Sequence, residues 1–318
     1  MKILDFEYIK NLNIAPSIVY EWCNEAWRIK DACVLPAKQK MWEGNDGRYI
    51  TMPCVLPELD VSGIKFISRN MKSNTGVPAR NSNIILYQRS KMGPLAILDG
   101  IWITNMRTGA IAAHSVIEYS TTSLSSLGLM GLGNAARAFM LMLGNLYKKE
   151  LSVKLYRYKD QAETFKTRFE KDFPQFHFDI VNSVDEICSC DTVVSAVSCA
   201  HGEFAQSDTF KKGCLVVPIH GDGFQNCDLC FDKIIIDDHA HCKSYKYYEQ
   251  FKDKAIEVTE LETGRKRGRD NDKQRLIAYC GGIALHDLYC AYKIWQIAKT
   301  RADAPTVEMH YPLERFWV

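Results

Sequence analysis

The chain has 318 residues, of which 47% are hydrophobic and 25% are charged. This composition is that of an ordinary globular protein and excludes a fibrous or disordered chain, and at roughly 150 residues per domain the length favours two domains. Forty Lys and Arg against 38 Asp and Glu leave a formal net charge of +2, so no overall field recruits nucleic acid or an anionic membrane. We therefore expect no nucleic-acid and no membrane partner.

The start of the chain, MKILDFEYIKNLN, lacks the apolar core and the small-residue cleavage site of a secretory signal. No run reaches the roughly 18 apolar residues that a membrane helix needs. The twelve cysteines lie mostly inside apolar segments and not at regular loop spacings. Without a secretory signal, we expect reduced thiols in a cytoplasmic protein.

One cluster has residue types that suit zinc, namely Cys227, Cys230, His239, His241 and Cys242. Between its two halves lies an apolar run over residues 231–238, which is typical of a buried strand. A strand of about 7 residues at about 3.3 Å each would hold the two halves about 20 Å apart, too far for one ion. We therefore predict buried or edge thiols here and no metal site.

Residues 1–121 are predicted to be mixed α/β. An opening helix over Ser17–Ala26 precedes short runs of loosely alternating polar and apolar residues, which indicate a sheet with one solvated face. The runs are Arg48–Met52, Gly63–Ile67, Ile84–Tyr87 and Leu95–Leu98, and turn signals at Glu43–Gly47 and Asn74–Pro78 separate them. A helix that begins near Arg107 closes this half.

From about Thr122, strands alternate with helices, which predicts βαβ units and a parallel sheet. A strand over Leu127–Met130 leads through a glycine turn into a helix with Phe139 and Leu143 on one face. A second strand is predicted at Val153–Tyr156, with a charged amphipathic helix over Gln161–Phe169 after it. Further short apolar runs are Phe176–Ile180, Thr192–Val197, Leu215–Ile219 and Lys233–Ile236. The basic run Arg265–Arg269 is interpreted as a solvated turn.

The glycine turn, Gly131-Leu-Gly133-Asn-Ala-Ala136, has the form G-x-G-x-x-A between a predicted strand and a predicted helix. A dinucleotide-binding fingerprint requires this context. Gly131 would permit the tight turn, Gly133 the close approach of a pyrophosphate, and Ala136 close packing of helix on strand. The phosphates would then lie on the N-terminus of the helix. The alternative is a glycine turn that serves backbone geometry alone.

The tip of the second strand has the sequence Tyr156-Arg157-Tyr158-Lys159. NAD enzymes usually carry Asp or Glu there, for the ribose hydroxyls, whereas a basic tip favours the 2′-phosphate of NADP. We therefore expect NAD(P) as cofactor, with a preference for NADP through Arg157. The alternative is that Arg157 is a solvated loop charge.

Five segments in order resemble the ornithine cyclodeaminase/mu-crystallin family. The strongest is Pro94-Leu-Ala-Ile-Leu-Asp-Gly-Ile-Trp-Ile-Thr-Asn-Met-Arg-Thr-Gly-Ala-Ile-Ala-Ala, which is similar to its P-x-A-x-x-D-G-x-x-I-T-x-x-R-T-G-A-x-x-A segment. The glycine turn follows at the expected distance. The remaining three are Met52-Pro with Gly63-Ile-Lys and then Asn70 and Asn74, His220-Gly-Asp, and Gly281-Gly-Ile-Ala-Leu-His-Asp.

The resemblance implies a Rossmann dinucleotide-binding domain inserted into a mixed α/β substrate and dimerisation domain, in a homodimer. On this basis residues 122–289 form the Rossmann domain, and residues 1–121 with 290–318 form the other. It also implies an NAD(P)-dependent enzyme on the Cα–N bond of a small amino or imino acid. The family hosts cyclodeaminases, amino-acid dehydrogenases and ketimine reductases, and mu-crystallin leaves a non-catalytic NADPH-dependent ligand-binding protein as the alternative.

Carried over by position, Lys65 and Arg107 match the substrate-binding lysine and arginine of the family, and Asp222 matches its catalytic aspartate. An arginine can grip an α-carboxylate through two parallel hydrogen bonds, and proton transfer at the nitrogen needs an acid/base such as Asp222, with Lys65 close by. Taken alone, each has a plainer interpretation: a surface salt bridge for Lys65, a helix-start charge for Arg107 and a turn-forming residue for Asp222. We also assign four residues to the cofactor site: Thr108, Asn134, Ala135 and Gly282.

The sequence departs from the family in places. Lys38 takes the place of an arginine that adds a second carboxylate contact, and a lysine is a point charge without the arginine fork. After Asp222 comes Gly-Phe-Gln-Asn-Cys-Asp-Leu, where true ornithine cyclodeaminases have Pro-Gly-Lys-Thr-Glu-Leu. The segments Pro36-Ala-Lys-Gln and Gly63-Ile-Lys-Phe-Ile-Ser resemble the branch that oxidises N-(carboxyalkyl) amino acids. Ornithine is therefore not the substrate that we expect.

Overall fold

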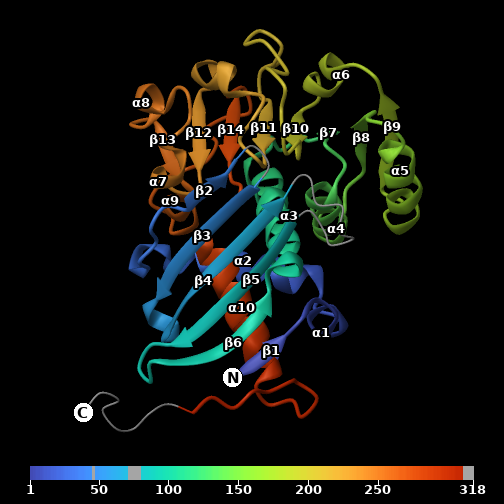
Figure 1. Cartoon of the computed structure of the whole chain (residues 1–318). Helices are drawn as coiled ribbons and strands as arrows, with labels where there is room; N and C mark the ends of the chain where they lie inside the picture. Colours follow the sequence, from blue (N-terminus) through green and yellow to red (C-terminus); the bar gives the residue numbers. More distant parts are fainter. Residues whose placement is uncertain (45–46, 71–79, 311–318) are drawn as a thin grey trace. The chain divides into compact units, whose positions relative to one another are not determined.

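A computed structural model describes residues 1–44, 47–70 and 80–310. The predicted turn at residues 74–78, Asn74 itself and the middle of the turn at 43–47 lie outside these ranges. The chain folds into two compact units (Figure 1). Unit 1 comprises residues 1–13, 32–103 and 287–318, and unit 2 comprises residues 14–31 and 104–286.

Unit 1 is built on a six-stranded sheet in the order β1-β6-β5-β4-β3-β2. Only β1 and β6 pair in parallel, and the other neighbours are antiparallel. The strands are β1 (Lys2–Leu4), β2 (Gln39–Glu43), β3 (Gly47–Leu56), β4 (Val61–Asn70), β5 (Arg80–Gln88) and β6 (Gly93–Asp99). The four predicted runs of this half are confirmed as β3 to β6. The sequence did not show β2, because all five of its residues are exposed and carry no alternating pattern.

One face of the unit 1 sheet is buried. Alternate residues of β3, such as Met52 and Cys54, lie on this face, as do Ile84 and Leu86 of β5. Helix α10 (Ala284–Ala298), which belongs to unit 1 from residue 287 onward, packs here: a side-chain carbon placed on Gly63 would lie 3.2 Å from Leu288. Unit 1 also contains α1 (Phe6–Asn11), η2 (Pro57–Leu59) and residue 32, the end of η1 (Lys30–Ala32).

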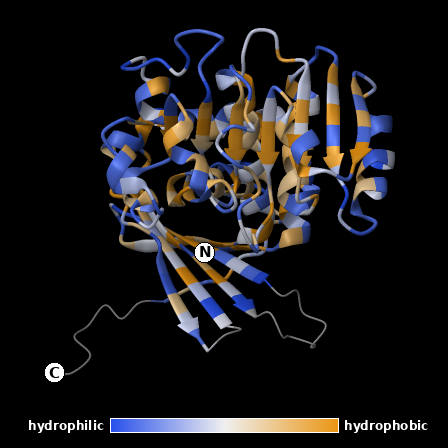
Figure 2. Cartoon of the chain, turned by 90° about the horizontal axis from the view of Figure 1, so that it is seen from above, coloured by the Kyte–Doolittle hydropathy of each residue, from blue (hydrophilic) through white to orange (hydrophobic). Residues whose placement is uncertain are grey.

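Unit 2 contains an eight-stranded sheet in the order β13-β12-β14-β11-β10-β7-β8-β9, with every neighbouring pair parallel. The strands are β7 (Ser126–Met130), β8 (Leu151–Tyr156), β9 (Phe176–Val181), β10 (Thr192–Ser195), β11 (Leu215–Pro218), β12 (Lys233–Ile236), β13 (Ala255–Glu257) and β14 (Leu276–Tyr279). Hydrophobic residues dominate these strands (Figure 2), as expected of a sheet covered on both faces. The predicted strand–helix alternation and parallel sheet are confirmed. Strands β13 and β14 were not predicted from the sequence.

The longer helices of unit 2 are α2 (Pro16–Ile29), α3 (Gly100–Tyr119, in unit 2 from residue 104), α4 (Asn134–Leu146) and α5 (Gln161–Asp172). Its short helices are α6 (Val184–Cys188), η3 (Gln225–Cys230), α7 (His239–Cys242), α8 (Tyr248–Phe251) and α9 (Val258–Glu262). Helix α3 begins well before the predicted Arg107, because Asp99 accepts a 2.7 Å hydrogen bond from the N–H of Trp102 and caps the first turn. Across the described ranges, no helix combines the length and apolarity needed to cross a membrane.

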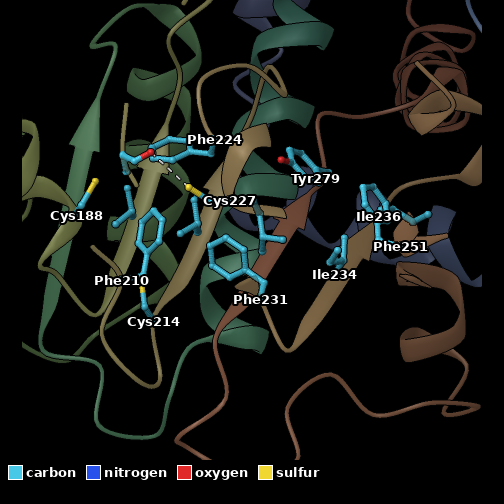
Figure 3. Close-up of a cluster of buried hydrophobic side chains, with 14 of the residues drawn as sticks. Cys188, Phe210, Cys214, Phe224, Cys227, Phe231, Ile234, Ile236, Phe251 and Tyr279 are labelled. Atoms are coloured by element: carbon cyan, nitrogen blue, oxygen red, sulfur yellow. Dashed lines mark hydrogen bonds between the residues drawn. The ribbon is translucent and has the colours of Figure 1, made fainter. Parts of the chain in front are cut away.

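Four cysteines lie in a hydrophobic cluster of unit 2: Cys188, Cys214 and Cys227, which Figure 3 labels, and Cys242. Burial raises the pKa of Cys214 and of Cys227 to about 12, which keeps both as neutral thiols. The twelve cysteines, all within the described ranges, form no disulfide bond. The predicted strand between the two halves of the zinc-like cluster is confirmed as β12. Among the described residues, no three His, Cys, Asp or Glu side chains group so as to hold a metal.

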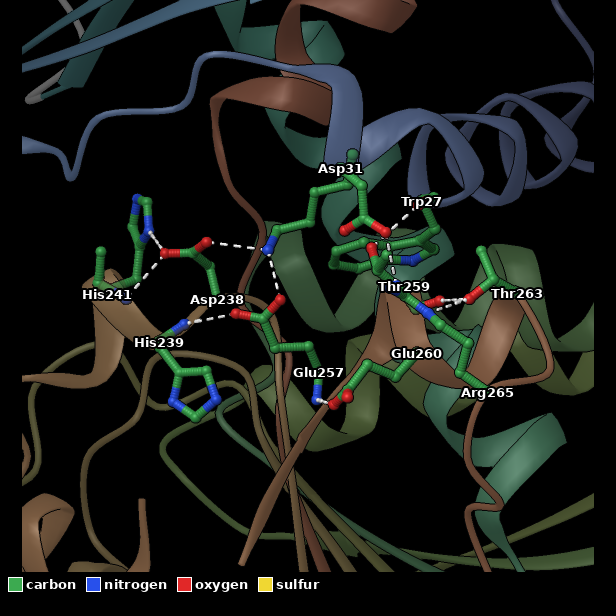
Figure 4. Close-up of polar contacts among 12 residues, drawn as sticks. Trp27, Asp31, Asp238, His239, His241, Glu257, Thr259, Glu260, Thr263 and Arg265 are labelled. Carbon is green, nitrogen blue, oxygen red and sulfur yellow. Dashed lines mark hydrogen bonds and ion pairs between the residues drawn. The ribbon is translucent and has the colours of Figure 1, made fainter. Parts of the chain in front are cut away.

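Residues 14–31 belong to unit 2 although we expected them in the first domain, and a buried charge network explains why (Figure 4). Lys30 is 8% exposed, and its Nζ lies 2.9 Å from Asp238 and 2.6 Å from Glu257. Beside it, the Thr259 hydroxyl donates a 2.9 Å hydrogen bond to the carbonyl of Trp27. Burial favours the protonated form of Asp238, yet hydrogen bonds from His241 and Lys30 hold its pKa well below the usual range.

The interpretation of Arg265–Arg269 as a solvated turn is wrong for its last residue. Arg269 is half-buried and donates to the carbonyls of Tyr119, Gly213 and Gln274. It therefore ties the end of α3 to two loops of unit 2. Arg265 is exposed and pairs with Asp31 at 2.6 Å, as a surface charge would.

Candidate active site

Several candidate residues of unit 2 lie in loops at the carboxyl ends of the parallel strands. Strand β7 lies between β8 and β10, so the strand order reverses at β7. In sheets of this kind, ligands bind outside the carboxyl ends of the strands where the order reverses. The loops that leave this edge carry Gly131 after β7, Asp222 after β11 and Gly281 after β14.

The glycine loop has the tight turn that the sequence predicts. Gly131 has φ +77°, and a side-chain carbon there would lie 2.5 Å from the backbone of Ala196 and Val197, so only glycine fits. Gly133 caps the N-terminus of α4 with no side-chain hydrogen bond, and a side-chain carbon there would meet no atom of the described residues within 4 Å. Ala136 is fully buried. An uncapped helix N-terminus with open space in front of it fits the pyrophosphate of a dinucleotide.

The tip of β8 presents two cations. Arg157 is about half-exposed and pairs with Glu163 in the first turn of α5. Lys159 lies over the exposed ring of Tyr158, with its Nζ 5.4 Å from the ring centre. The tip is therefore basic, as the sequence indicates, but the charge of Arg157 is matched by an adjacent carboxylate.

Arg107 is a buried residue of α3 and not a helix-start charge, since the helix begins at Gly100. It is 4% exposed, and its Nη1 donates a 2.6 Å hydrogen bond to the carbonyl of Gly281. Gly282, which we assigned to the cofactor, lies directly against it. Gly282 has φ +92°, and a side-chain carbon there would overlap the guanidinium of Arg107. Thr108, the next residue of α3, is also buried.

Asp237 was not predicted from the sequence as a site residue. It follows β12, is 4% exposed, and accepts a 2.5 Å hydrogen bond from the backbone N–H of Gly282. A signal was present, since the apolar run that predicts β12 ends in two acidic residues. An acidic residue at the carboxyl end of a buried parallel strand lies at the edge of the sheet where ligands bind.

Asp222 is exposed on the turn that follows β11. The turn closes through the N–H of Gly221, which donates to the carbonyl of Pro218 at 3.0 Å. Gln225 Nε2 donates to the carbonyl of Gly221 at 2.9 Å, and a side-chain carbon on Gly221 would lie 2.6 Å from the hydroxyl of Tyr245. Contacts at Gly221 thus hold the turn in place, while Asp222 remains exposed to solvent.

In unit 1, Lys65 is at the centre of β4 and pairs in register with Met52 and Ile84, which places it on the buried face of the sheet. Its Nζ lies 2.8 Å from Oδ1 of Asp287 on α10, and both side chains are 0% exposed. The surface salt bridge considered for Lys65 is therefore wrong. Two opposite charges in a dry interior are costly unless they pair closely, so this pair is unusual in a sheet core.

The other assigned residues are at the surface or nearly so. Lys38 is exposed in the segment before β2, in unit 1. Asn134 is exposed and Ala135 is half-buried in the first turn of α4, beside the open space at Gly133.

The order of the strands, the switch at β7 and the glycine loop place unit 2 in the Rossmann class of folds. The sequence profile of the Ornithine cyclodeaminase/mu-crystallin family matches residues 30–301, and the chain belongs to this family. The resemblance inferred from the motifs is thereby confirmed.

Relatives and solved structures agree with this assignment. The N-((2S)-2-amino-2-carboxyethyl)-L-glutamate dehydrogenase of Staphylococcus aureus is 24% identical over 83% of this chain and 82% of that protein. An archaeal alanine dehydrogenase dimer with bound NAD superposes with a TM-score of 0.86 at 21% identity, covering 98% of this chain and 99% of that one. Thermococcus litoralis Delta(1)-pyrroline-2-carboxylate reductase, in complex with NADH and L-proline, superposes with a TM-score of 0.84 at 20% identity. The match covers 96% of this chain and 100% of that one.

In η3, which follows the Asp222 turn, Asp228 is a buried carboxyl whose Oδ1 accepts a 2.5 Å hydrogen bond from Tyr279, while no described residue forms a hydrogen bond with its Oδ2. Burial raises the pKa of Asp228 to about 7. The folded protein therefore holds a proton here between about pH 4 and pH 7 that the unfolded chain releases. Stability is lost as the pH rises through this window.

We predict that Asp228→Asn removes this loss, because an amide does not ionise. Relative to the variant, the wild type should lose up to about 4 kcal/mol of unfolding free energy between pH 4 and pH 8, at about 1.36 kcal/mol per pKa unit. Urea unfolding across this range measures the difference. Asp208→Asn, the same change at an exposed side chain, should give a curve parallel to the wild type. A parallel curve for Asp228→Asn would contradict the prediction.

Proposed function

We propose that this chain is an NAD(P)-dependent oxidoreductase or deaminase that acts on the Cα–N bond of a small amino or imino acid. The observation that carries the proposal is that one chain combines an open, uncapped dinucleotide loop with two buried and anchored cations, Lys65 and Arg107. Family membership supports the same class of reaction.

The open loop at Gly133 and the N-terminus of α4 would hold the pyrophosphate of the cofactor. When bound, a nicotinamide supplies hydride chemistry, taking a hydride from Cα as the C–N bond becomes C=N or returning it in the opposite direction. Asn134 and Ala135 lie beside the same helix end, and we propose that they contact the cofactor. Thr108 is proposed to contact it from α3.

Arg107 is proposed to bind the α-carboxylate. A guanidinium has five N–H donors in a planar fork that matches a carboxylate, and the bond to Gly281 uses one of them. Lys38 is proposed to add a second positive charge for the same or a neighbouring carboxylate. Pairing the carboxylate with a cation fixes the position of Cα, and in the reductive direction it lessens the repulsion between the carboxylate and the incoming hydride.

Asp222 is proposed to move the proton at the substrate nitrogen. As an exposed carboxylate on a fixed turn, it can take a proton from the amine as C=N forms and return it in the reductive direction. Lys65 is proposed as the second polar group at the reacting atoms. Because Asp287 holds its ammonium at 2.8 Å, Lys65 has a fixed charge with which to orient water or a substrate oxygen.

We propose that the substrate is an N-(carboxyalkyl) amino acid or a small amino acid, in preference to ornithine. The Staphylococcus aureus relative is a dehydrogenase of an N-carboxyethyl amino acid, and the segments around Lys38 and Lys65 resemble that branch. The residues after Asp222 depart from those of ornithine cyclodeaminases.

The direct test follows reduced-nicotinamide absorbance and ammonia in one cuvette, with NADP or NAD and a panel of diamino and N-carboxyalkyl amino acids. A rise in reduced cofactor identifies a dehydrogenase, and ammonia without net reduced cofactor identifies a cyclodeaminase. Asp222→Asn should lower turnover by about 100-fold or more and spare cofactor binding, because it removes only proton transfer. Turnover of Asp222→Asn at the wild-type rate would show the acid/base assignment to be wrong.

We further propose NADP as the preferred cofactor, through the cations at the tip of β8. Arg157→Ala should weaken NADPH binding by about 10-fold or more and leave NADH binding unchanged, because a charged hydrogen bond to the 2′-phosphate contributes about 1.5–3 kcal/mol. Glu163→Gln is the matched control: it releases Arg157 from its ion pair and should tighten NADPH binding. Equal weakening of both cofactors by Arg157→Ala would contradict the preference. Nucleotide fluorescence titration measures both.

We also propose a homodimer in the cytoplasm. The outer face of the unit 1 sheet exposes large apolar side chains, among them Met41 and Phe66, with Tyr49 stacked on Phe66 at 6.0 Å. Exposed apolar groups on a flat sheet are typical of an association surface. The alanine dehydrogenase with the same fold is a dimer. Twelve cysteines outside disulfide bonds suit the reducing cytoplasm.

A further inference from the structure

One peptide group of unit 2 joins a buried anion to a buried cation. The group between Gly281 and Gly282 has its carbonyl bonded to Nη1 of Arg107 at 2.6 Å. Its N–H, which belongs to Gly282, donates to Oδ2 of Asp237 at 2.5 Å. Asp237, this peptide group and Arg107 thus form a chain of two hydrogen bonds, which we call the relay. It runs from the carboxylate to the peptide N–H, and from the peptide carbonyl to the guanidinium.

The charges at the two ends act in the same sense on this peptide. A negative charge at the N–H and a positive charge at the carbonyl both favour the direction of the peptide dipole. In a dry interior, hydrogen bonds in series polarise one another and strengthen. Both end groups are 4% exposed, so solvent does little to weaken the effect. The carboxylate of Asp237 thus makes the carbonyl of Gly281 a better acceptor for Arg107.

The backbone at Gly282 makes the relay specific to glycine. With φ +92°, this residue is in the left-handed region, and a side-chain carbon there would overlap the guanidinium. The guanidinium therefore lies directly on the α-carbon of Gly282. The other side of the relay is fixed by the sheet, because Ile236 pairs with Tyr279 and Asp237 directly follows β12.

We propose that Asp237 is a positioning residue for recognition of the substrate carboxylate, which acts by fixing Arg107 through the peptide between Gly281 and Gly282. The inference rests on the proposed function for what Arg107 binds. It gives Gly282 a role in substrate binding in place of the cofactor role that the sequence suggested.

Three variants of the full-length protein test the relay. Asp237→Ala removes the charge and the acceptor, Asp237→Asn keeps an acceptor oxygen and removes the charge, and Gly282→Ala displaces the guanidinium. With an amino or imino acid that the wild type converts, Asp237→Ala and Gly282→Ala should raise KM by about 10-fold or more. Asp237→Asn should raise KM by less, and NADPH affinity should stay unchanged in all three.

The matched control is Asp191→Asn. Asp191 also accepts hydrogen bonds from backbone N–H groups, those of Ser125 and Ser126, but it precedes β10 at the amino end of the sheet. Its loss should lower the melting temperature and leave KM unchanged. An unchanged KM in Asp237→Ala, with a lower melting temperature, would show a merely structural role and overturn the proposal. So would weaker NADPH binding by Gly282→Ala with KM unchanged.

A stability cycle separates this inference from the proposed function. If the wild type converts no member of the substrate panel, the proposed function fails, but the relay is still tested by thermal unfolding of Asp237→Asn, Arg107→Gln and the double variant. Coupled end groups predict that the double variant loses less stability than the sum of the two single losses. Strict additivity would overturn the relay whatever the activity.

Discussion

The close pairing of Lys65 with Asp287 is the constraint that permits a lysine in the sheet core of unit 1, and the proposed site depends on it. Both side chains are fully buried, and Lys65 lies on β4, one of the two central strands, on the face that also buries Met52 and Ile84. Replacing a buried pair of this kind with apolar residues is often neutral or stabilising. A sheet core does not need such a pair for stability, which agrees with the role at the reacting atoms that we propose for Lys65.

Unit 2 also holds a buried cation in a fixed position, and it does so with backbone groups. Its buried cation, Arg107, is held by the carbonyl of Gly281 and lies on Gly282. Gly281 and Asp287, the anchors of the two cations, are only six residues apart in the sequence. Gly281 and Gly282, just before α10, hold the guanidinium in unit 2, and Asp287, in the first turn of α10, holds the ammonium in unit 1.

The sequence predicted those features that depend on local patterns. Alternation between strands and helices revealed the parallel sheet, and the glycine turn placed α4 and its open N-terminus. Features set by distant pairing were not predictable: Lys65 and Asp287 are 222 residues apart, and Lys30 and Glu257 are 227 apart. The role of Asp237 was hidden for a related reason, because β14 lies beside β12 although β13 comes between them in the sequence.

The double variant Lys65→Met with Asp287→Leu tests most directly whether the buried pair serves catalysis. Both replacements are apolar and similar in volume, so the protein should fold, melt at the same or a higher temperature, and bind NADPH as the wild type does. If the pair acts at the reacting atoms, turnover of the substrate then falls by about 100-fold or more. A folded, cofactor-binding double variant that turns over at the wild-type rate would contradict this role.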